Sequence, residues 1–509
     1  MVQEIEKKIL DETFDISPEE IHKLGNAVNN LIIEYFKDFD KSKIITNKDF
    51  KQLKELIGEP LPQDGQKPES ILLECKEKII DNAVRIGHPR FLGWVLPPGT
   101  IIGAYADGLA SAINQNVAIS GSGVATAVEI QVIEWIKQIL EYGPGAGGIL
   151  TSGGTIANLN AINIARNIKS ENNVQKQGMK NQKDMIIYTT KEVHACIPKA
   201  VSILGIGTDN ICWINVDENL SLDTADLEAK IVNDQNNNKQ PFLVIASAGT
   251  VNTGAVDPLN KIADICQKYN LWFHVDAAYG GFATLSPNYK PILNGIKRAD
   301  SIALDPHKWL FIPYEAGCVL VKNASNMKKT YAIAADYLHK NYDELKKDEI
   351  DFSDYGIQLS RGFRALKIWM SIKQYGVKKY GRIIEQNINL AKYFESLVQD
   401  IEDIEPISKV VLSTFCFRYI PVDLKKQLVQ GYDKEKINNY LDKLNRKIVD
   451  LFYNDQRAII SYTKIKNCFV LRLCIVNYRT KKQDIENIVD LVLELGSKAD
   501  KNLRSTFFN

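Results

Sequence analysis

The sequence lacks the features that mark several classes of protein. Its 509 residues carry a formal net charge of +1, so no excess of charge favours nucleic acid or an acidic membrane surface. The eight cysteines form no C-x-x-C pair, and neither they nor the six dispersed histidines have the spacing of metal ligands. We therefore expect free thiols in a reducing compartment, no metal site and no nucleic-acid partner.

Long apolar runs are missing too. No run approaches the ~20 residues that a membrane helix needs, and the stretch from Met1 to Ile9 carries mixed charge without the apolar core of a signal peptide. What is present is an ordinary globular composition, 45% hydrophobic and 25% charged. The length suggests roughly two to four structural units. We expect a cytoplasmic protein with no membrane partner.

Short apolar strands alternate with helical stretches through the middle of the chain. The expected strands cover residues 149–150, 185–188, 242–246, 271–275 and 302–304, and the expected helices cover residues 156–168, 198–204 and 259–269. This βαβ alternation predicts an α/β fold with a mostly parallel sheet and helices on both faces. After about residue 380 a smaller α+β region is expected, with strands at 413–419 and 469–475 and a last helix at 482–496.

The N-terminal part, up to about residue 87, is charged and has a helical pattern. Within it, Ser17-Pro18-Glu19-Glu20 predicts a helix start with proline at the first helical position. An aromatic loop from Gly87 to Trp94 follows, and packing is its simplest role. We also predict two helices within residues 101–140 and another at 365–375.

Lys308 directly follows an expected strand end. The run from Ile302 to Leu304 is apolar, and Asp305-Pro306 ends it because proline restrains its own φ and the residue before it. Such a lysine is either an ordinary surface residue or a partly buried amine. A buried amine survives through a shifted pKa, an ion pair or an imine bond.

Thr151-Ser152-Gly153-Gly154-Thr155 is a candidate anion site. It follows a short strand and opens a helix, so its glycines let the backbone approach a ligand closely. Thr155 is expected to cap the helix while offering its hydroxyl. A plain glycine turn before a capped helix is the alternative.

Several polar residues lie just past the carboxyl end of an expected strand: Gly154, Thr155, His194, Thr250, Asp276 and Lys308. Open α/β sheets bind ligands at that edge, so we expect these residues to converge. Singly, Asp276 could cap a turn and His194 could be an ordinary loop histidine. Together the set indicates pyridoxal phosphate, with Lys308 holding it as a Schiff base and Asp276 pairing with the pyridine nitrogen. His194 would lie on the ring, and the phosphate would be held by Gly154, Thr155 and His307.

Seven motifs follow one another along the chain: HPRF at 88–91, TSGGTIAN at 151–158, VHACIPKA at 193–200, SAGTVNTGAVDP at 247–258, HVDAAYGG at 274–281, DPHKW at 305–309 and RGFRALKIW at 361–369. In these motifs and their order the chain resembles the group II pyridoxal-phosphate decarboxylases, the aromatic-L-amino-acid decarboxylase family. The resemblance extends from about residue 85 to the C-terminus. It is specific for the family and much weaker for the substrate.

The resemblance implies a PLP-dependent transferase fold of the aspartate aminotransferase type (fold type I), with a mostly parallel seven-stranded sheet. It implies a homodimer with a three-part subunit: an N-terminal helical segment over 1–98 that packs on the partner, a large cofactor domain over 99–375 and a small α+β domain over 376–509. It also implies cofactor contacts from Thr250 and Ala278, and from Leu359 and Ser360 across the dimer.

The resemblance also implies catalytic roles for Lys308, His194, Asp276 and Tyr337. In this family a loop tyrosine assists proton return to Cα after CO₂ leaves, and members with phenylalanine there tend toward oxidative aldehyde formation. Tyr337 is similar to that residue, although Asp336 precedes it where the family has a wider gap. The reaction implied is simple decarboxylation of an L-amino acid to its amine.

The aromatic loop is the expected wall of the substrate pocket. Phe91, Trp94, Val95 and Leu96 suggest an apolar wall, which favours an aromatic substrate such as tryptophan, tyrosine or phenylalanine. A bulky Trp94 could instead narrow the pocket toward valine or leucine. Glutamate or aspartate would need an added cation, for which Arg90 is the candidate.

Two other classes of protein remain open. An aminotransferase or lyase on the same fold would show amine exchange that depends on a keto acid and releases no CO₂. A cofactor-free scaffold would lack an absorption band near the visible edge. That band, lost on Lys308→Ala, would identify a cofactor-binding enzyme.

Overall fold

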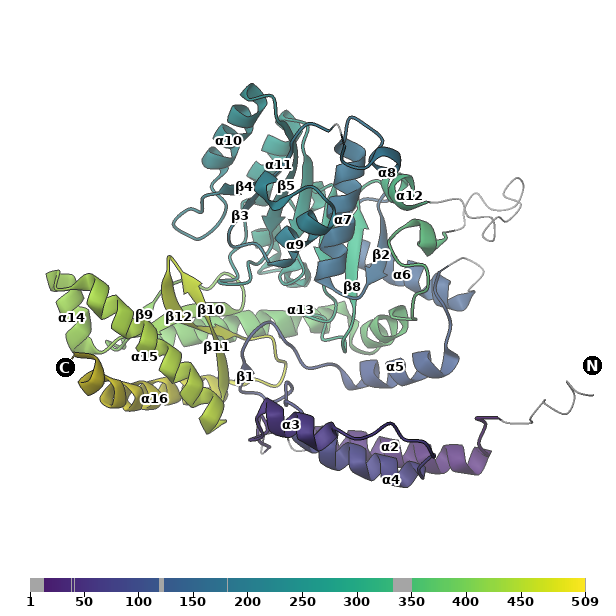
Figure 1. Cartoon of the computed structure of the whole chain (residues 1–509), viewed down its shortest axis with the longest axis horizontal. Coiled ribbons are helices and arrows are strands. Elements are labelled where there is room, and N and C mark those ends of the chain that lie inside the picture. The colour runs from purple at the N-terminus through teal and green to yellow at the C-terminus, as the bar shows by residue number, and fades with distance from the viewer. Residues whose placement is uncertain are drawn as a thin grey trace, which may run out of the picture. The chain divides into compact units, whose positions relative to one another are not determined.

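The computed structural model describes residues 13–37, 39–40, 42–118, 123–180, 182–332 and 350–508. The chain forms two compact units, Met1–His88 and Pro89–Asn509 (Figure 1). The first unit contains α2 (Pro18–Lys37), α3 (Phe50–Ile57) and α4 (Pro68–Glu74). As predicted, α2 begins at Pro18. Ser17 and Glu20 cap it reciprocally: the Ser17 N–H donates to Glu20 Oε2 at 2.9 Å and the Glu20 N–H donates to Ser17 Oγ at 3.2 Å.

The second unit contains both sheets. Its helices are α5 (Ile101–Ile113), α6 (Val124–Ile139), α7 (Gly154–Lys169), α8 (Val174–Gln177), α9 (Cys196–Ile203), α10 (Thr224–Asn236), α11 (Leu259–Lys268), α12 (Ser325–Tyr331), α13 (Ala365–Val398), α14 (Val422–Gln430), α15 (Lys434–Asp455) and α16 (Lys482–Phe508). Its strands are β1 (Phe91–Leu92), β2 (Gly147–Thr151), β3 (Met185–Thr190), β4 (Ile211–Ile214), β5 (Gln240–Ser247), β6 (Trp272–Asp276), β7 (Ser301–Leu304), β8 (Gly317–Val321), β9 (Ile404–Pro406), β10 (Thr414–Tyr419), β11 (Ile459–Ile465) and β12 (Cys468–Cys474).

The larger sheet has seven strands in the order β2-β8-β7-β6-β5-β3-β4. Strands from β7 to β4 pair in parallel, whereas β8 runs antiparallel to both β7 and β2. The predicted α/β fold with a mostly parallel seven-stranded sheet is therefore confirmed. Because β2 runs in the same direction as β7, its carboxyl end lies at the same edge of the sheet as those of β3, β5, β6 and β7.

The smaller sheet has five strands in the order β1-β11-β12-β10-β9. All its pairs are antiparallel except β1 with β11, where Phe91 is opposite Ile459. The aromatic loop thus contributes a two-residue strand to a sheet formed mainly by the C-terminal region. Helix α15 packs on β11 and β12, with α14 and α16 alongside (Figure 1). The division at residues 98 and 375 stays a prediction.

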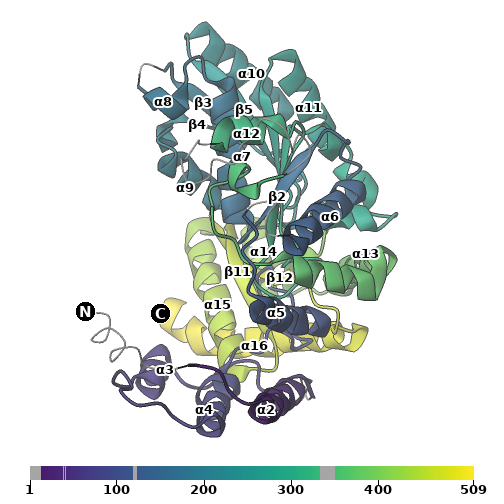
Figure 2. The same ribbon diagram turned by 90° about the vertical axis from the view of Figure 1, so that its right-hand side faces the viewer.

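Two large hydrophobic clusters form most of the core, one around each sheet, and a small third cluster contains Leu220, Cys416, Ile465 and Val470. Helix α13 belongs to both large clusters, contributing residues up to Ile388 to the first cluster and residues from Leu390 to the second. It bends at Gly376, whose φ of 66° and ψ of 149° interrupt the helical geometry. Helices α5 and α6 lie on either side of α13 (Figure 2).

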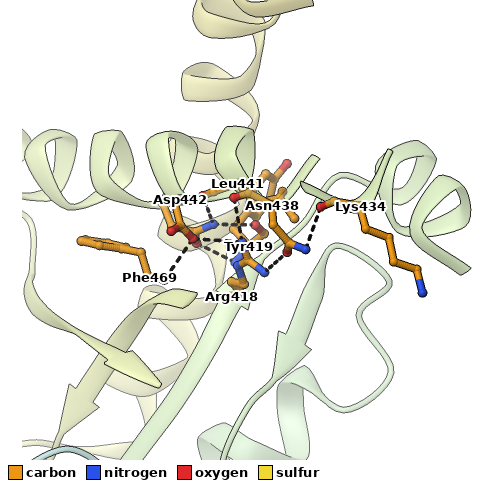
Figure 3. Close-up of polar contacts among 8 residues, drawn as sticks. Arg418, Tyr419, Lys434, Asn438, Leu441, Asp442 and Phe469 are labelled. Atoms are coloured by element: carbon orange, nitrogen blue, oxygen red, sulfur yellow. Dashed lines mark hydrogen bonds and ion pairs between the residues drawn. The ribbon is translucent and has the colours of Figure 1, made fainter. Parts of the chain in front are cut away.

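A buried polar network ties α15 to the smaller sheet (Figure 3). The fully buried Asn445 satisfies both backbone groups of Tyr419 in β10, accepting from its N–H at 2.8 Å and donating to its carbonyl at 2.9 Å. Beside it, the Arg418 guanidinium donates to Asp442 at 3.1 Å, and the same carboxylate oxygen accepts the Phe469 N–H at 3.0 Å. The network therefore replaces strand-to-strand bonds at the end of β10.

Asn445→Ala should destabilise the protein because it leaves the Tyr419 N–H and carbonyl buried without partners. We expect a loss of about 2–3 kcal/mol in the free energy of unfolding, measured from the urea midpoint. Asn439→Ala, an exposed position on the same helix, is the control and should cost less than about 0.5 kcal/mol. Equal midpoints for the two variants would contradict this role for Asn445.

Candidate active site

The carboxyl ends of β2, β3, β5, β6 and β7 surround a cavity of about 340 Å³. Its lining comprises Val95, Ser152, Gly153, Gly154, Thr155, Asn158, His194, Cys196, Gly249, Val251, Asp276, Ala278, Tyr279, Asp305, His307 and Lys308. Open α/β sheets bind ligands at this edge, and the volume suits a small molecule. Segments far apart in the sequence thus meet at the carboxyl edge of the sheet, as the sequence predicted.

Lys308 lies just past the end of β7, in the turn that begins at Asp305. Its Nζ is 3.0 Å from Asp305 Oδ2, and Asp305 is only 2% exposed. Burial alone would lower the pKa of Lys308, but the carboxylates of Asp305 and Asp276 outweigh that effect and raise it. Asp305 therefore holds the amine as an ammonium ion in the cofactor-free chain.

Asp276, the last residue of β6, is buried and lines the same cavity as Lys308. Its Oδ1 accepts the Ala278 N–H at 3.2 Å. Burial raises the pKa of Asp276, and the Lys308 ammonium opposes this rise. The pair predicted from the sequence therefore stands at one edge of the sheet.

His194 follows β3, and its Nδ1 accepts the backbone N–H of Cys196 at 3.1 Å. In the neutral ring the proton is then on Nε2. Burial lowers the pKa of His194 despite the nearby Asp276 carboxylate. His307 is similarly fixed: its Nδ1 accepts the Ala316 N–H at 3.1 Å, and burial lowers its pKa.

The glycine loop opens α7, but not as predicted. The helix begins at Gly154 and Gly153 precedes it as the cap, without a side-chain hydrogen bond. Thr155 already lies inside the first turn, so the expectation that it caps the helix is wrong. The glycine backbone starts the helix one residue earlier than a Thr155 cap would, and Thr155 still lines the cavity.

Some predicted residues do not line the cavity. Thr250 is buried beside it, where its Oγ1 accepts the Ala255 N–H at 3.1 Å, while Gly249 and Val251 face the cavity. Of the four residues predicted to form the wall of the substrate pocket, Val95 alone lines the cavity. Phe91 is buried in β1, the Trp94 ring lies 6.2 Å from that of Phe91, and Leu96 is partly buried. Their roles in substrate binding stay predictions.

Two further predicted residues belong to the segment after β8. Ser360 is exposed, as a residue that reaches a partner subunit has to be, and its phosphate contact stays a prediction. Tyr337 lies outside the described residues, so its catalytic role also stays a prediction.

Sequence reasoning missed Asp305 as a site residue. Asp305 was interpreted only as the end of a strand, although its spacing of three residues from Lys308 in a turn could have indicated an ion pair. Asn158 and Cys196 were also missed, since Asn158 lies inside an expected helix and Cys196 in the loop just before one. Nothing in their local sequence indicates that α7 and α9 meet at the cavity.

The residues at this edge fit pyridoxal phosphate. A Cβ on Gly154 would stand 2.9 Å from Asp305 Oδ2 and 3.2 Å from Ala278 Cβ, so glycine is needed for the first turn of α7 to approach β6 and β7. In that turn the N–H groups of Ile156 and Ala157 donate to the Gly153 carbonyl, whereas those of Gly154 and Thr155 lie too near the helix start for an intrahelical bond and suit an anion. A lysine amine for an aldehyde and a carboxylate for a ring nitrogen share the same cavity.

Comparison with known proteins agrees with this chemistry. The family model described as "Pyridoxal-dependent decarboxylase conserved domain" matches residues 51–420. The chain is 34% identical over 482 residues to the aromatic-L-amino-acid decarboxylase of Bacillus atrophaeus, covering 94% of this chain and 96% of that protein. It is 29% identical over 464 residues to an L-2,4-diaminobutyrate decarboxylase of Acinetobacter baumannii, covering 89% and 88%. The crystal structure of mouse CSAD is similar, with a TM-score of 0.87, 27% identity and coverage of 94% and 99%.

Fold and site together define a pyridoxal-phosphate enzyme of fold type I. The chain belongs to the pyridoxal-dependent decarboxylase family. It is therefore a carboxy-lyase that acts on an amino acid, and the aminotransferase and scaffold alternatives are set aside. Among the described residues, no helix is both long and apolar enough to cross a bilayer.

Proposed function

We propose that the chain decarboxylates an aromatic amino acid (tryptophan, tyrosine or phenylalanine) to its amine and CO₂. The cavity lining supports this: Val95, Val251 and Tyr279 offer apolar or aromatic surface, and among the described lining residues Lys308 is the one lysine or arginine. The side chain of an acidic substrate would find no cation there besides Lys308, which the cofactor would occupy. One relative named for aromatic substrates is 34% identical, while others named for tyrosine or tryptophan are 25–29% identical and those named for diaminobutyrate and acidic amino acids are 29% identical.

Each residue of the site has a distinct task in this reaction. Bound pyridoxal phosphate supplies a ring that accepts the electron pair left on Cα when CO₂ departs. Lys308 would provide the amine that bonds the cofactor's aldehyde carbon, and Asp276 would keep a proton on the ring nitrogen. The first turn of α7, with His307, would hold the phosphate, and His194 would lie against the ring.

A screen of the twenty amino acids for CO₂ release, with added pyridoxal phosphate, tests the proposal. An aromatic amino acid should give the highest kcat/KM. A higher value for valine or leucine would support a narrowed pocket, and one for glutamate, aspartate or diaminobutyrate would require a cation from outside the described lining. Either result would overturn the aromatic assignment.

Tyr337→Phe is expected to suppress amine formation by about 10²-fold or more, because the loop tyrosine would return the proton to Cα. Aldehyde and hydrogen peroxide should rise at the same time when oxygen is present. Product analysis by chromatography measures both. Tyr432→Phe, at an exposed position in the loop after α14, is the control. Unchanged amine production by Tyr337→Phe would refute the role of Tyr337.

We also propose that the active form is a homodimer. Helix α5 exposes Ile101, Tyr105, Leu109 and Ile113 at helical spacing, and such a contiguous apolar stripe favours association. The exposed Ser360 would then reach the partner's phosphate. Light scattering should give twice the 57.3 kDa chain mass. Leu109→Asp should lower that mass toward the monomer, and a monomeric active wild-type enzyme would contradict the proposal.

A further inference from the structure

His274 lies in the centre of β6 and is completely buried, and no role described above uses it. Its Nε2 is 2.7 Å from Asn158 Oδ1, and its Nδ1 is 2.9 Å from Ser301 Oγ. The Trp272 indole N–H donates to the same Ser301 Oγ at 2.9 Å. A histidine two residues before Asp276 is thus connected across the sheet to the helix that opens the cavity.

The partners of Asn158 fix the direction of these hydrogen bonds. Asn158 Nδ2 is 2.8 Å from the Gly154 carbonyl, which can only accept, so the amide nitrogen must face Gly154. Asn158 Oδ1 therefore faces His274 and accepts a hydrogen bond from its Nε2–H. Nδ1 is then free to accept from the Ser301 hydroxyl, whose oxygen accepts from Trp272. The neutral tautomer protonated on Nε2 satisfies the bonds with Asn158 Oδ1 and Ser301 Oγ, and the Ser301 backbone carbonyl, 3.2 Å from Nδ1, then receives no hydrogen bond from the ring.

Burial independently favours that neutral ring. It lowers the pKa of His274 to about 4, since the described surroundings contribute a backbone contact with Ser301 but no carboxylate at the ring. At neutral pH the imidazole therefore carries a single proton. The hydrogen-bond pattern places that proton on Nε2.

Asn158 connects His274 with the cavity, because Asn158 bonds to His274 and also lines the cavity. Besides its bond to Gly154, its Nδ2 lies 3.6 Å from the sulfur of Cys196, at the start of α9. Cys196 in turn donates its backbone N–H to His194. One amide thus contacts both the first turn of α7 and the segment that orients His194.

We propose that His274 is a positioning residue: its Nε2–H fixes the amide of Asn158, which holds the first turn of α7 in place to receive the cofactor phosphate. The inference rests on the proposed roles of Gly154 and the α7 turn. A purely structural role would loosen the whole cavity, whereas a positioning role acts through the phosphate.

The test compares pyridoxal phosphate with pyridoxal, which lacks the phosphate, by titrating each into protein stripped of cofactor and following absorbance. His274→Leu removes the donor and should weaken pyridoxal phosphate binding by about 10–100-fold, the range seen when a residue that orients a metal ligand is lost. Pyridoxal binding should change little. His274→Gln keeps an N–H near the Nε2 position and should restore most of the affinity for pyridoxal phosphate.

Two further variants distinguish a specific effect on phosphate binding from a general folding defect. Asn158→Asp turns an oxygen toward the Gly154 carbonyl and should give the same phosphate-selective loss. Asn445→Ala removes a buried amide in the other core cluster and should leave both ligands unaffected. An equal loss for both ligands, or no loss in His274→Leu and Asn158→Asp, would overturn the proposal.

The tautomer gives a second, independent measurement on the wild-type chain. Nitrogen NMR of protein labelled at histidine, with the signal identified by its loss in His274→Gln, should show a neutral ring protonated on Nε2 at pH 7. A charged ring, or a proton on Nδ1, would overturn the argument. No amino acid substrate enters these measurements, so a wrong substrate class would leave them unchanged. Failure of the wild-type chain to bind pyridoxal phosphate would instead count against the cofactor site itself.

Discussion

Lys308→Ala is expected to reduce CO₂ release by at least about 10³-fold and to abolish the absorption band that the enzyme shows near the visible edge with its cofactor. The amine at position 308 is the group in the described cavity that can bond an aldehyde carbon. Its ion pair with Asp305 keeps it at the end of β7, facing the same space as Asp276. Activity assays and absorbance spectra measure the two effects.

Lys308→Arg distinguishes the role of the positive charge at position 308 from the ability of its amine to bond an aldehyde. Arginine keeps a cation beside Asp305, so the fold should survive, but its delocalised guanidinium cannot replace the amine. We expect activity and the absorption band to be lost in this variant as in Lys308→Ala, with an urea midpoint closer to that of the wild type. Substantial CO₂ release by either variant would remove Lys308 from the mechanism.

Arg361→Met should destabilise the protein by about 3–5 kcal/mol, because it leaves the Glu129 carboxylate buried and unpaired. Both side chains are fully buried, and their ion pair also holds β2: the Leu150 N–H donates to Glu129 at 3.0 Å, and Arg361 donates to the Leu150 carbonyl at 2.7 Å. Urea unfolding measures the loss. Burial already raises the pKa of Glu129 against the opposing charge of Arg361.

The loss of stability in Arg361→Met should depend on pH, and its direction follows from the titration of Glu129. In Arg361→Met the pKa of Glu129 in the folded state stays above its unfolded value without Arg361 to oppose it, so the folded state binds the extra proton. Stability then falls as pH rises, and the variant should suffer less at pH 5 than at pH 8. Arg364→Met, three residues along the same motif, removes the partner of the half-exposed Glu315 and should cost less than about 1 kcal/mol. Similar losses for the two variants would argue against a special role for the buried pair.

The fold and much of the site were predictable because the signals are local. An apolar strand followed at once by a polar residue recurs at Asp276 and Lys308, and parallel strands bring such positions together. Strand β8 was not predicted, since a buried run such as Gly317–Val321 gives no local sign of its direction. Strand β1 was missed because two residues are too few to show a period of two.

The missing parts of the site depend on contacts between distant segments. Asn158 contacts His274 across 116 residues of sequence, and Arg361 contacts Glu129 across 232. Each of these residues, viewed alone, is an ordinary polar residue, in a helix or strand or, for Arg361, in the loop before α13. The pairings arise from packing of helices on the sheet, which no pattern of spacing along one segment encodes.

Helix α13 has a consequence for how the second unit comes apart. Between the bend at Gly376 and its end at Val398, the helix packs residues up to Ile388 around one sheet and residues from Leu390 onward around the other, without a break between them. A continuous helix cannot unwind at one end of this stretch without disturbing the hydrogen bonds of the next turn. Heating should therefore melt the cofactor-binding sheet and the C-terminal sheet in a single cooperative transition rather than one after the other.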